Sequence, residues 1–127
     1  MYELIIKDEF DAAHFLENHH GQCESLHGHT WRVEAVFSGT RIEKKSGLLV
    51  DFKKLKSSLA DILLKLDHSF LNKNKFLGKL NPSCENLARF IYGSLKKETG
   101  HKLKPLIKLE RVTVWESASA GVTYFET

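Results

Sequence analysis

The sequence predicts an α+β fold in which a four-stranded antiparallel sheet carries two helices on one face, in the order ββααββ. Apolar and polar residues alternate in two segments near the N-terminus and in two near the C-terminus, which is typical of half-buried strands. Between these pairs, two segments repeat apolar residues at helical spacing. Amphipathic helices and a sheet with one apolar face pack as two layers around one core.

The first two strands are expected at residues 4–14 and in the segment that ends at Gly39. In the first, the even positions are mostly apolar, whereas Lys7, Glu9 and Asp11 take the other face. In the second, the residues that share one face are Trp31, Val33, Ala35 and Phe37. Because side chains of a strand alternate between faces, each segment offers one side to a core.

Two helices are expected in the middle of the chain. The first starts after the N-cap Asp51, repeats apolar residues as far as Leu66, and should end at Asp67-His68. The second starts after Pro82-Ser83, with Ser83 as the N-cap, and should stop at Gly100.

The last two strands are expected at residues 107–115 and 122–125. In the first of them, the apolar residues occupy odd positions as far as Leu109 and even positions from Val112 to Val114. This change predicts a β-bulge near Glu110-Arg111. The turn between the two strands is expected at residues 117–121.

Composition excludes several classes of protein. At 127 residues the chain is expected to form a single domain, residues 1–127, with ordinary hydrophobic and charged content. A formal charge of +3, spread along the chain, does not favour nucleic-acid binding. No apolar run reaches the length of a membrane span, and the N-terminus does not resemble a signal peptide. Two cysteines in different contexts favour a reducing, cytoplasmic location.

The strongest functional motif is His27-Gly28-His29. Two residues apart on a strand, these imidazoles share the face that Trp31 continues, and His14 ends the neighbouring strand on a compatible face. Three imidazoles without an obligatory fourth protein ligand are typical of a catalytic zinc, which keeps one position open. The alternative is a closed structural site in which Cys23 is the fourth ligand.

Three further features could carry chemistry, each with a plainer explanation. Cys23 precedes the histidine pair and could be a base or nucleophile, or a small buried residue. Asp67-His68 could be an acid–base pair, or a histidine that interacts with a helix dipole. Glu116 ends a strand and could hold ligand N–H groups, or be solvated.

These pieces together resemble the 6-pyruvoyltetrahydropterin synthase family, which includes the bacterial 6-carboxy-5,6,7,8-tetrahydropterin synthases of queuosine biosynthesis. The resemblance spans nearly the whole chain, and its motifs are specific jointly rather than singly. The matching motifs are Phe10-x-Ala12-Ala13-His14, Cys23-x3-His27-Gly28-His29, Asp51-Phe52, Leu66-Asp67-His68, Asn81-Pro82-Ser83-x-Glu85-Asn86-Leu87-Ala88 and Trp115-Glu116-Ser117.

The resemblance implies a tunnelling fold (T-fold), a homohexamer built from two trimers, and active sites between subunits. It implies a lyase that uses Zn²⁺ and acts on 7,8-dihydroneopterin triphosphate. By matching position, it assigns zinc binding to His14, His27 and His29, proton abstraction to Cys23, a proton relay to Asp67 with His68, and pterin anchoring to Glu116, Ser83 and the backbone near Cys84.

Glu24, directly after Cys23, departs from the common pattern. It is similar to a bacterial subgroup that combines the cysteine of the queuosine enzymes with a glutamate that cleaves dihydroneopterin for folate synthesis. Glu24 is therefore expected to be a second base, and the alternative is a surface glutamate. The spacing of Cys23, by resemblance, favours the queuosine type over 6-pyruvoyltetrahydropterin formation. A hypothesis of another class is a non-catalytic binding module that zinc stabilises.

Overall fold

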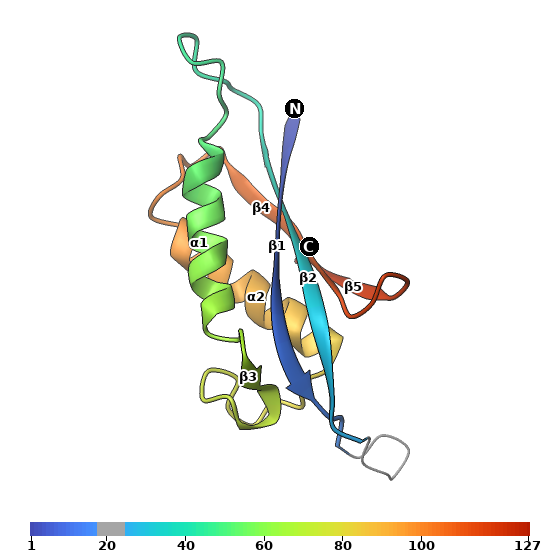
Figure 1. Cartoon of the computed structure of the whole chain (residues 1–127). Helices are drawn as coiled ribbons and strands as arrows, with labels where there is room; N and C mark the ends of the chain where they lie inside the picture. The colour runs from blue at the N-terminus through green and yellow to red at the C-terminus, as the bar shows by residue number, and fades with distance from the viewer. Residues whose placement is uncertain (18–24) are drawn as a thin grey trace.

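The fold is organised around a long hairpin of two thirteen-residue strands, β1 (Tyr2–His14) and β2 (His27–Gly39). The computed structural model describes residues 1–17 and 25–127. The hairpin is paired in register over its whole length, from Tyr2 opposite Gly39 to His14 opposite His27. The register therefore places the end of β1 beside the start of β2 (Figure 1).

Within the part of the chain that the structure describes, the sheet has five strands in the order β3-β1-β2-β4-β5, and not the four that the sequence predicts. The remaining strands are β3 (Ser69–Phe70), β4 (Lys108–Trp115) and β5 (Gly121–Tyr124). The two residues of β3 pair in parallel with Ala12 and Ala13 of β1, whereas the other pairings are antiparallel. A two-residue strand carries no recognisable alternation, so its pairing could not be found from periodicity.

Both helices pack against one face of the sheet, as the sequence predicts. Helix α1 (Phe52–Leu64) contacts β1, and helix α2 (Cys84–Thr99) contacts β4 and β5. The predicted N-caps are confirmed, because the side chain of Asp51 accepts from the Lys53 amide and that of Ser83 accepts from the Asn86 amide. The end of α1 was placed too late: it ends at Leu64, and a turn then leads to β3.

A single connected group of buried side chains fills the space between sheet and helices. The alternating residues of β1 and β2 supply its floor, and Trp31, Val33 and Phe37 are completely buried. The predicted bulge in β4 is confirmed, since Val36 pairs with Arg111 and Phe37 with Leu109. Among the described residues, no helix has the length and apolar character needed to span a bilayer.

Gly121 opens β5 where the indole of Trp115 lies close to its backbone. A methyl group at Gly121 would lie 2.8 Å from Trp115 Cε3 and 2.9 Å from the Val114 carbonyl oxygen. Gly121→Ala should therefore lower the free energy of unfolding by about 1–3 kcal/mol through overpacking. The control is Gly93→Ala in α2, where a methyl group meets nothing within 4 Å. This control should raise stability by up to about 1 kcal/mol. Urea unfolding measures both, and equal stability of Gly121→Ala and wild type would contradict the prediction.

Candidate metal centre and active site

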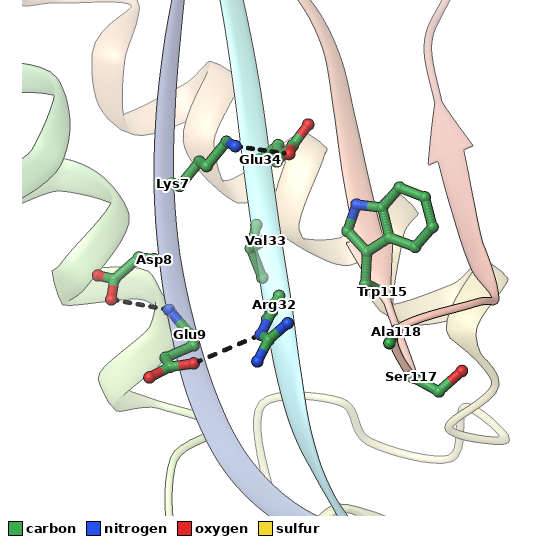
Figure 2. Close-up of a pocket in the computed structure, with 9 residues that line it drawn as sticks. All are labelled: Lys7, Asp8, Glu9, Arg32, Val33, Glu34, Trp115, Ser117 and Ala118. Carbon is green, nitrogen blue, oxygen red and sulfur yellow. Dashed lines mark hydrogen bonds and ion pairs between the residues drawn. The ribbon is translucent and has the colours of Figure 1, made fainter.

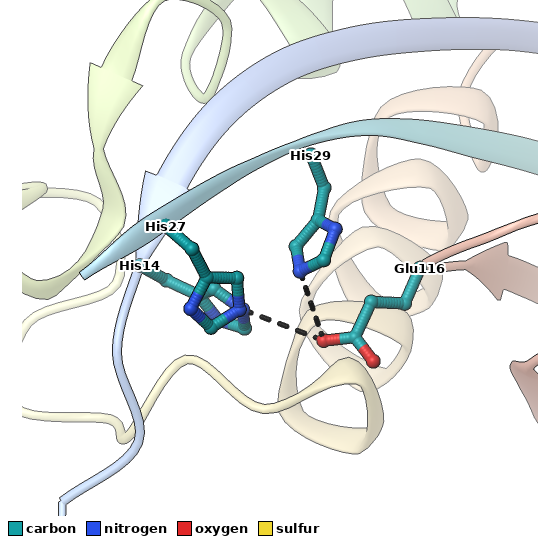
Figure 3. A group of neighbouring side chains, drawn as sticks. All are labelled: His14, His27, His29 and Glu116. Atoms are coloured by element: carbon teal, nitrogen blue, oxygen red, sulfur yellow. Dashed lines mark hydrogen bonds and ion pairs between the residues drawn. The ribbon is translucent and has the colours of Figure 1, made fainter. Parts of the chain in front are cut away.

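Three histidines converge at one end of the hairpin, on the face that the helices cover. His14 ends β1, His27 starts β2, and His29 follows two residues later on the same face. His14 is completely buried, whereas the side chain of His29 is 24% exposed. The alternation that buries Trp31 thus directs the three imidazoles toward one point (Figure 3).

Backbone carbonyl groups set the orientation of two of these rings. The Nδ1 atom of His14 lies 2.7 Å from the Pro82 oxygen, and that of His27 lies 2.7 Å from the Ser25 oxygen. Because a carbonyl oxygen only accepts, both Nδ1 atoms must carry the hydrogen, and both neutral rings then present a lone pair at Nε2. These two Nε2 atoms are 3.1 Å apart, so the arrangement favours a cation between them.

A carboxylate adds a fourth acceptor to this cluster. Glu116 follows β4, and its Oε1 atom lies 3.4 Å from His14 Nε2 and 3.5 Å from His29 Nε2. One ligand atom from each of the three histidines and Glu116 lies within 4.8 Å of the others. Imidazole and carboxylate are the ligands of zinc and similar transition metals, and backbone-oriented histidines are typical of such sites. These residues therefore fit a metal ion.

The cluster is accessible from one side. A hollow of about 310 Å³ lies beside Glu116 and His29, and its walls include Gly28, Arg32 and Trp115. This opening leaves room for a small molecule next to the candidate metal ligands.

A second hollow of about 510 Å³ lies on the face of the sheet away from the helices (Figure 2). It shares Arg32, Trp115, Ser117 and Ala118 with the first one. Pairs of oppositely charged side chains line it: Lys7 Nζ lies 3.4 Å from Glu34 Oε1, and Arg32 Nε lies 3.9 Å from Glu9 Oε2. Ion pairs at the surface contribute little to stability.

Asp67 and His68 form an ion pair in the turn between α1 and β3. His68 Nδ1 lies 2.9 Å from Asp67 Oδ2, while Asp67 Oδ1 accepts a hydrogen bond from the Asp11 amide at 2.9 Å. His68 also has a positive φ of 53°, which is costly for a residue with a side chain. Its amide donates to the Asp11 carbonyl at 2.6 Å, so β1 holds this conformation in place.

The pKa values of Asp67 and His68 are shifted in the directions that favour the ion pair. The hydrogen bond from the Asp11 amide, followed by that with His68, lowers the pKa of Asp67. The hydrogen bond with Asp67 and the charge of that carboxylate raise the pKa of His68. The stabilisation by Asp67 is lost as pH falls through its lowered pKa, and that by His68 is lost as pH rises through its raised pKa. Both members are charged between these limits.

The structure does not bring this pair to the histidine cluster of the same chain. Side chains alternate along β1, so the Asp11 carboxylate lies on the opposite face from His14. Ligand atoms of Asp11, Asp67 and His68 lie within 4.8 Å of one another. The pair therefore belongs to the face of the sheet that the helices leave uncovered.

The start of α2 lies beside the histidine cluster and carries two of the predicted pterin-binding residues, Ser83 and Cys84. The Ser83 hydroxyl caps the helix at 3.1 Å from the Asn86 amide, and Cys84 donates from Sγ to the Val114 carbonyl at 3.2 Å. Burial and the charge of Glu116 raise the pKa of Cys84 to about 11. Cys84 is therefore a protonated thiol that packs against β4. The predicted bases Cys23 and Glu24 lie outside the described residues.

The sequence analysis did not identify three contributors to the two candidate clusters. The Pro82 and Ser25 carbonyls that orient His14 and His27 are backbone groups, so no residue type signals them. Asp11 was noted only as a polar-face residue, although aspartate is depleted inside strands. That anomaly was the available signal for its contacts with Asp67 and His68.

Fold and cluster together define an α+β protein with a metalloenzyme-like centre of three histidines and a carboxylate at strand ends. The family model for 6-pyruvoyl tetrahydropterin synthase matches residues 3–127. The chain belongs to this family and is a lyase of it.

Curated relatives carry more than one name. The chain is 36% identical to the 6-carboxy-5,6,7,8-tetrahydropterin synthase of Synechocystis sp., covering 96% of this chain and 92% of the relative. It is 37% identical to the dihydroneopterin monophosphate aldolase of Pyrococcus furiosus, covering 94% and 93%.

Solved structures share the fold. The 6-pyruvoyl tetrahydropterin synthase of Plasmodium vivax matches with a TM-score of 0.81 and 25% identity, covering 98% of this chain and 97% of that one. The Caenorhabditis elegans 6-pyruvoyl tetrahydropterin synthase matches with a TM-score of 0.80 and 24% identity, covering 99% and 96%. The second likeness concerns the fold alone.

The left-handed conformation of His68 makes a prediction about stability. His68→Gly and His68→Ala both remove the imidazole, but only glycine adopts a positive φ without steric cost. The glycine variant should therefore be more stable than the alanine variant by about 1 kcal/mol. Ser69→Gly and Ser69→Ala are the controls at the first residue of β3. There the glycine variant should be the less stable one, because a strand disfavours glycine. Thermal unfolding of the four variants checks this, and His68→Ala matching His68→Gly would contradict it.

Proposed function

We propose that the protein converts 7,8-dihydroneopterin triphosphate to 6-carboxy-5,6,7,8-tetrahydropterin in a zinc-dependent reaction that eliminates triphosphate and releases the rest of the side chain as acetaldehyde. The observation that carries this proposal is the convergence of three histidine Nε2 atoms and Glu116 beside an open hollow. The names of several relatives support the choice of reaction. The product would supply queuosine biosynthesis.

His14, His27 and His29 would hold the metal ion. When bound, zinc polarises the oxygens of the substrate side chain and makes neighbouring C–H groups more acidic. Glu116 would accept hydrogen bonds from the N–H and NH2 edge of the pterin, because a carboxylate has two acceptor oxygens for two donors. Ser83 and the backbone near Cys84 would contact the same ring.

Proton transfer would need residues from more than one chain. Cys23 would take a proton from the substrate, and the Asp67–His68 pair would relay protons. Since this pair lies on the opposite sheet face from the cluster of its own chain, a second copy of the chain would have to present it. A homo-oligomer, such as a hexamer of two trimers with sites between subunits, meets this requirement.

A second candidate function is cleavage of dihydroneopterin to 6-hydroxymethyl-dihydropterin. The 37% identity to a dihydroneopterin monophosphate aldolase favours it, together with the adjacency of Glu24 and Cys23. Two neighbouring residues could each approach the substrate side chain with a different reach. Formation of 6-pyruvoyltetrahydropterin is a third outcome of the same assay.

Mass spectrometry of the products formed from 7,8-dihydroneopterin triphosphate and from dihydroneopterin tests these proposals. Cys23→Ala should reduce formation of the 6-carboxy product by about 10²–10⁴-fold, the usual contribution of a general acid or base. Glu24→Ala should spare that product and reduce the 6-hydroxymethyl product. If Glu24→Ala leaves both rates intact, the second activity is wrong. If wild type forms neither the carboxy product nor acetaldehyde, the main proposal is wrong.

Zinc content separates the metal ligands from the substrate-binding carboxylate. His27→Ala should lose zinc, because it removes one of three imidazole ligands. Cys23→Ala and Glu116→Gln should keep it, while Glu116→Gln should weaken pterin binding by about 1–3 kcal/mol through an unmatched donor. Elemental analysis and a pterin-binding titration measure these effects. Zinc loss in Cys23→Ala would favour the closed structural site, and zinc loss in Glu116→Gln would make Glu116 a ligand.

A further inference from the structure

Asp11 occupies an unusual place for a charged residue. It lies inside β1, opposite Thr30 of β2, on the sheet face that the helices leave uncovered. Its neighbour on the same face, Glu9, is paired with Arg32, whereas a carboxylate oxygen of Asp11 lies within 4.8 Å of one from Asp67. Two carboxylates within 4.8 Å repel each other unless a cation lies beside them. His68 is the group in position to supply that charge.

The backbone of Asp11 holds both members of the Asp67–His68 pair. Its amide donates to Asp67 Oδ1 at 2.9 Å, and its carbonyl accepts from the His68 amide at 2.6 Å. The second bond forms at the residue with positive φ, so it maintains a conformation that the chain would otherwise avoid.

The side chain of Asp11 is itself held in place. Its Oδ1 atom accepts a hydrogen bond from the Thr30 hydroxyl at 2.5 Å, across the β1–β2 ladder. A charge-assisted bond of this length restricts the carboxylate to one orientation. Thr30 is next to His29 in the sequence, so the same strand carries a metal ligand on one face and this donor on the other.

We propose that Asp11, held by Thr30, is a positioning residue whose carboxylate assists Asp67 in favouring the charged form of the His68 imidazole on the uncovered face. This inference rests on the proposed role of the Asp67–His68 pair in proton transfer. Held in this way, His68 starts the reaction cycle as a proton donor.

The groups that face His68 are consistent with this role. Asp67 comes from its own turn, and Asp11 comes from β1. From β2, Thr30 lines the same shallow hollow as His68, and His29 borders this hollow although its imidazole belongs to the cluster on the other face of the sheet. Asp67 is the main cause of the raised pKa of His68, and the charge of Asp11 acts in the same direction. Removal of Asp11 should therefore change the titration of His68 without breaking its bond to Asp67.

The test uses Asp11→Asn, which keeps the backbone bonds and the shape of the side chain but removes its charge. Thr30→Val removes the hydroxyl and keeps both the β-branched shape and the Asp11 charge. Glu9→Gln is the matched control, since it removes a carboxylate two residues away on the same strand face. Imidazole NMR of the full chain across pH follows His68, whose signals are assigned by their absence in His68→Gln.

His68 should titrate at lower pH in Asp11→Asn than in wild type, with a smaller shift in Thr30→Val and none in Glu9→Gln. In the lyase assay, Asp11→Asn should lower kcat roughly tenfold, a fraction of the 10²–10⁴ that a general acid contributes, with little change in KM. An unchanged His68 titration in both Asp11→Asn and Thr30→Val overturns the proposal. If the titration of His68 shifts but kcat is unchanged, the effect of Asp11 on His68 is supported. That result would overturn the proposed role of the Asp67–His68 pair in proton transfer.

Discussion

Side-chain alternation along the β1–β2 hairpin is the constraint on which the candidate site depends. Because the two strands pair in register over thirteen residues each, His14 meets His27, and His29 lies on the same face as both. A slip of one residue in either strand would turn its histidines to the opposite face. The large buried side chains of the same face, such as Phe10 and Trp31, oppose such a slip. Core packing and ligand geometry are thus determined by one register.

Local patterns were sufficient to predict the parts of the molecule that depend on local rules. The face shared by His14, His27 and His29 follows from strand period, and the cap at Asp51 follows from residue type next to an apolar repeat. The bulge at Glu110 follows from a change of parity within one strand. In each case the signal lies within a few residues and buried apolar neighbours reinforce it.

The features that were missed depend on contacts between distant segments. The pairing of β3 with β1 joins Ser69 to Ala12, and the end of α1 is decided by the turn that this pairing requires. The position of the Asp67–His68 pair on the uncovered face follows from that turn and the left-handed His68. Adjacent residues in a sequence carry no information about which sheet face they will reach after such a turn.

The hydrogen bond from His14 to the Pro82 carbonyl connects the candidate metal centre to the start of α2. An ion that binds the correctly oriented ring also favours the docked position of this helix end, and docking of the helix favours binding of the ion by the same free energy. If the cluster holds an ion, its occupancy and the packing of α2 are reciprocal properties. A change in the helix far from the four side chains would then alter affinity for the ion, and its removal would loosen a layer of the fold that does not touch it.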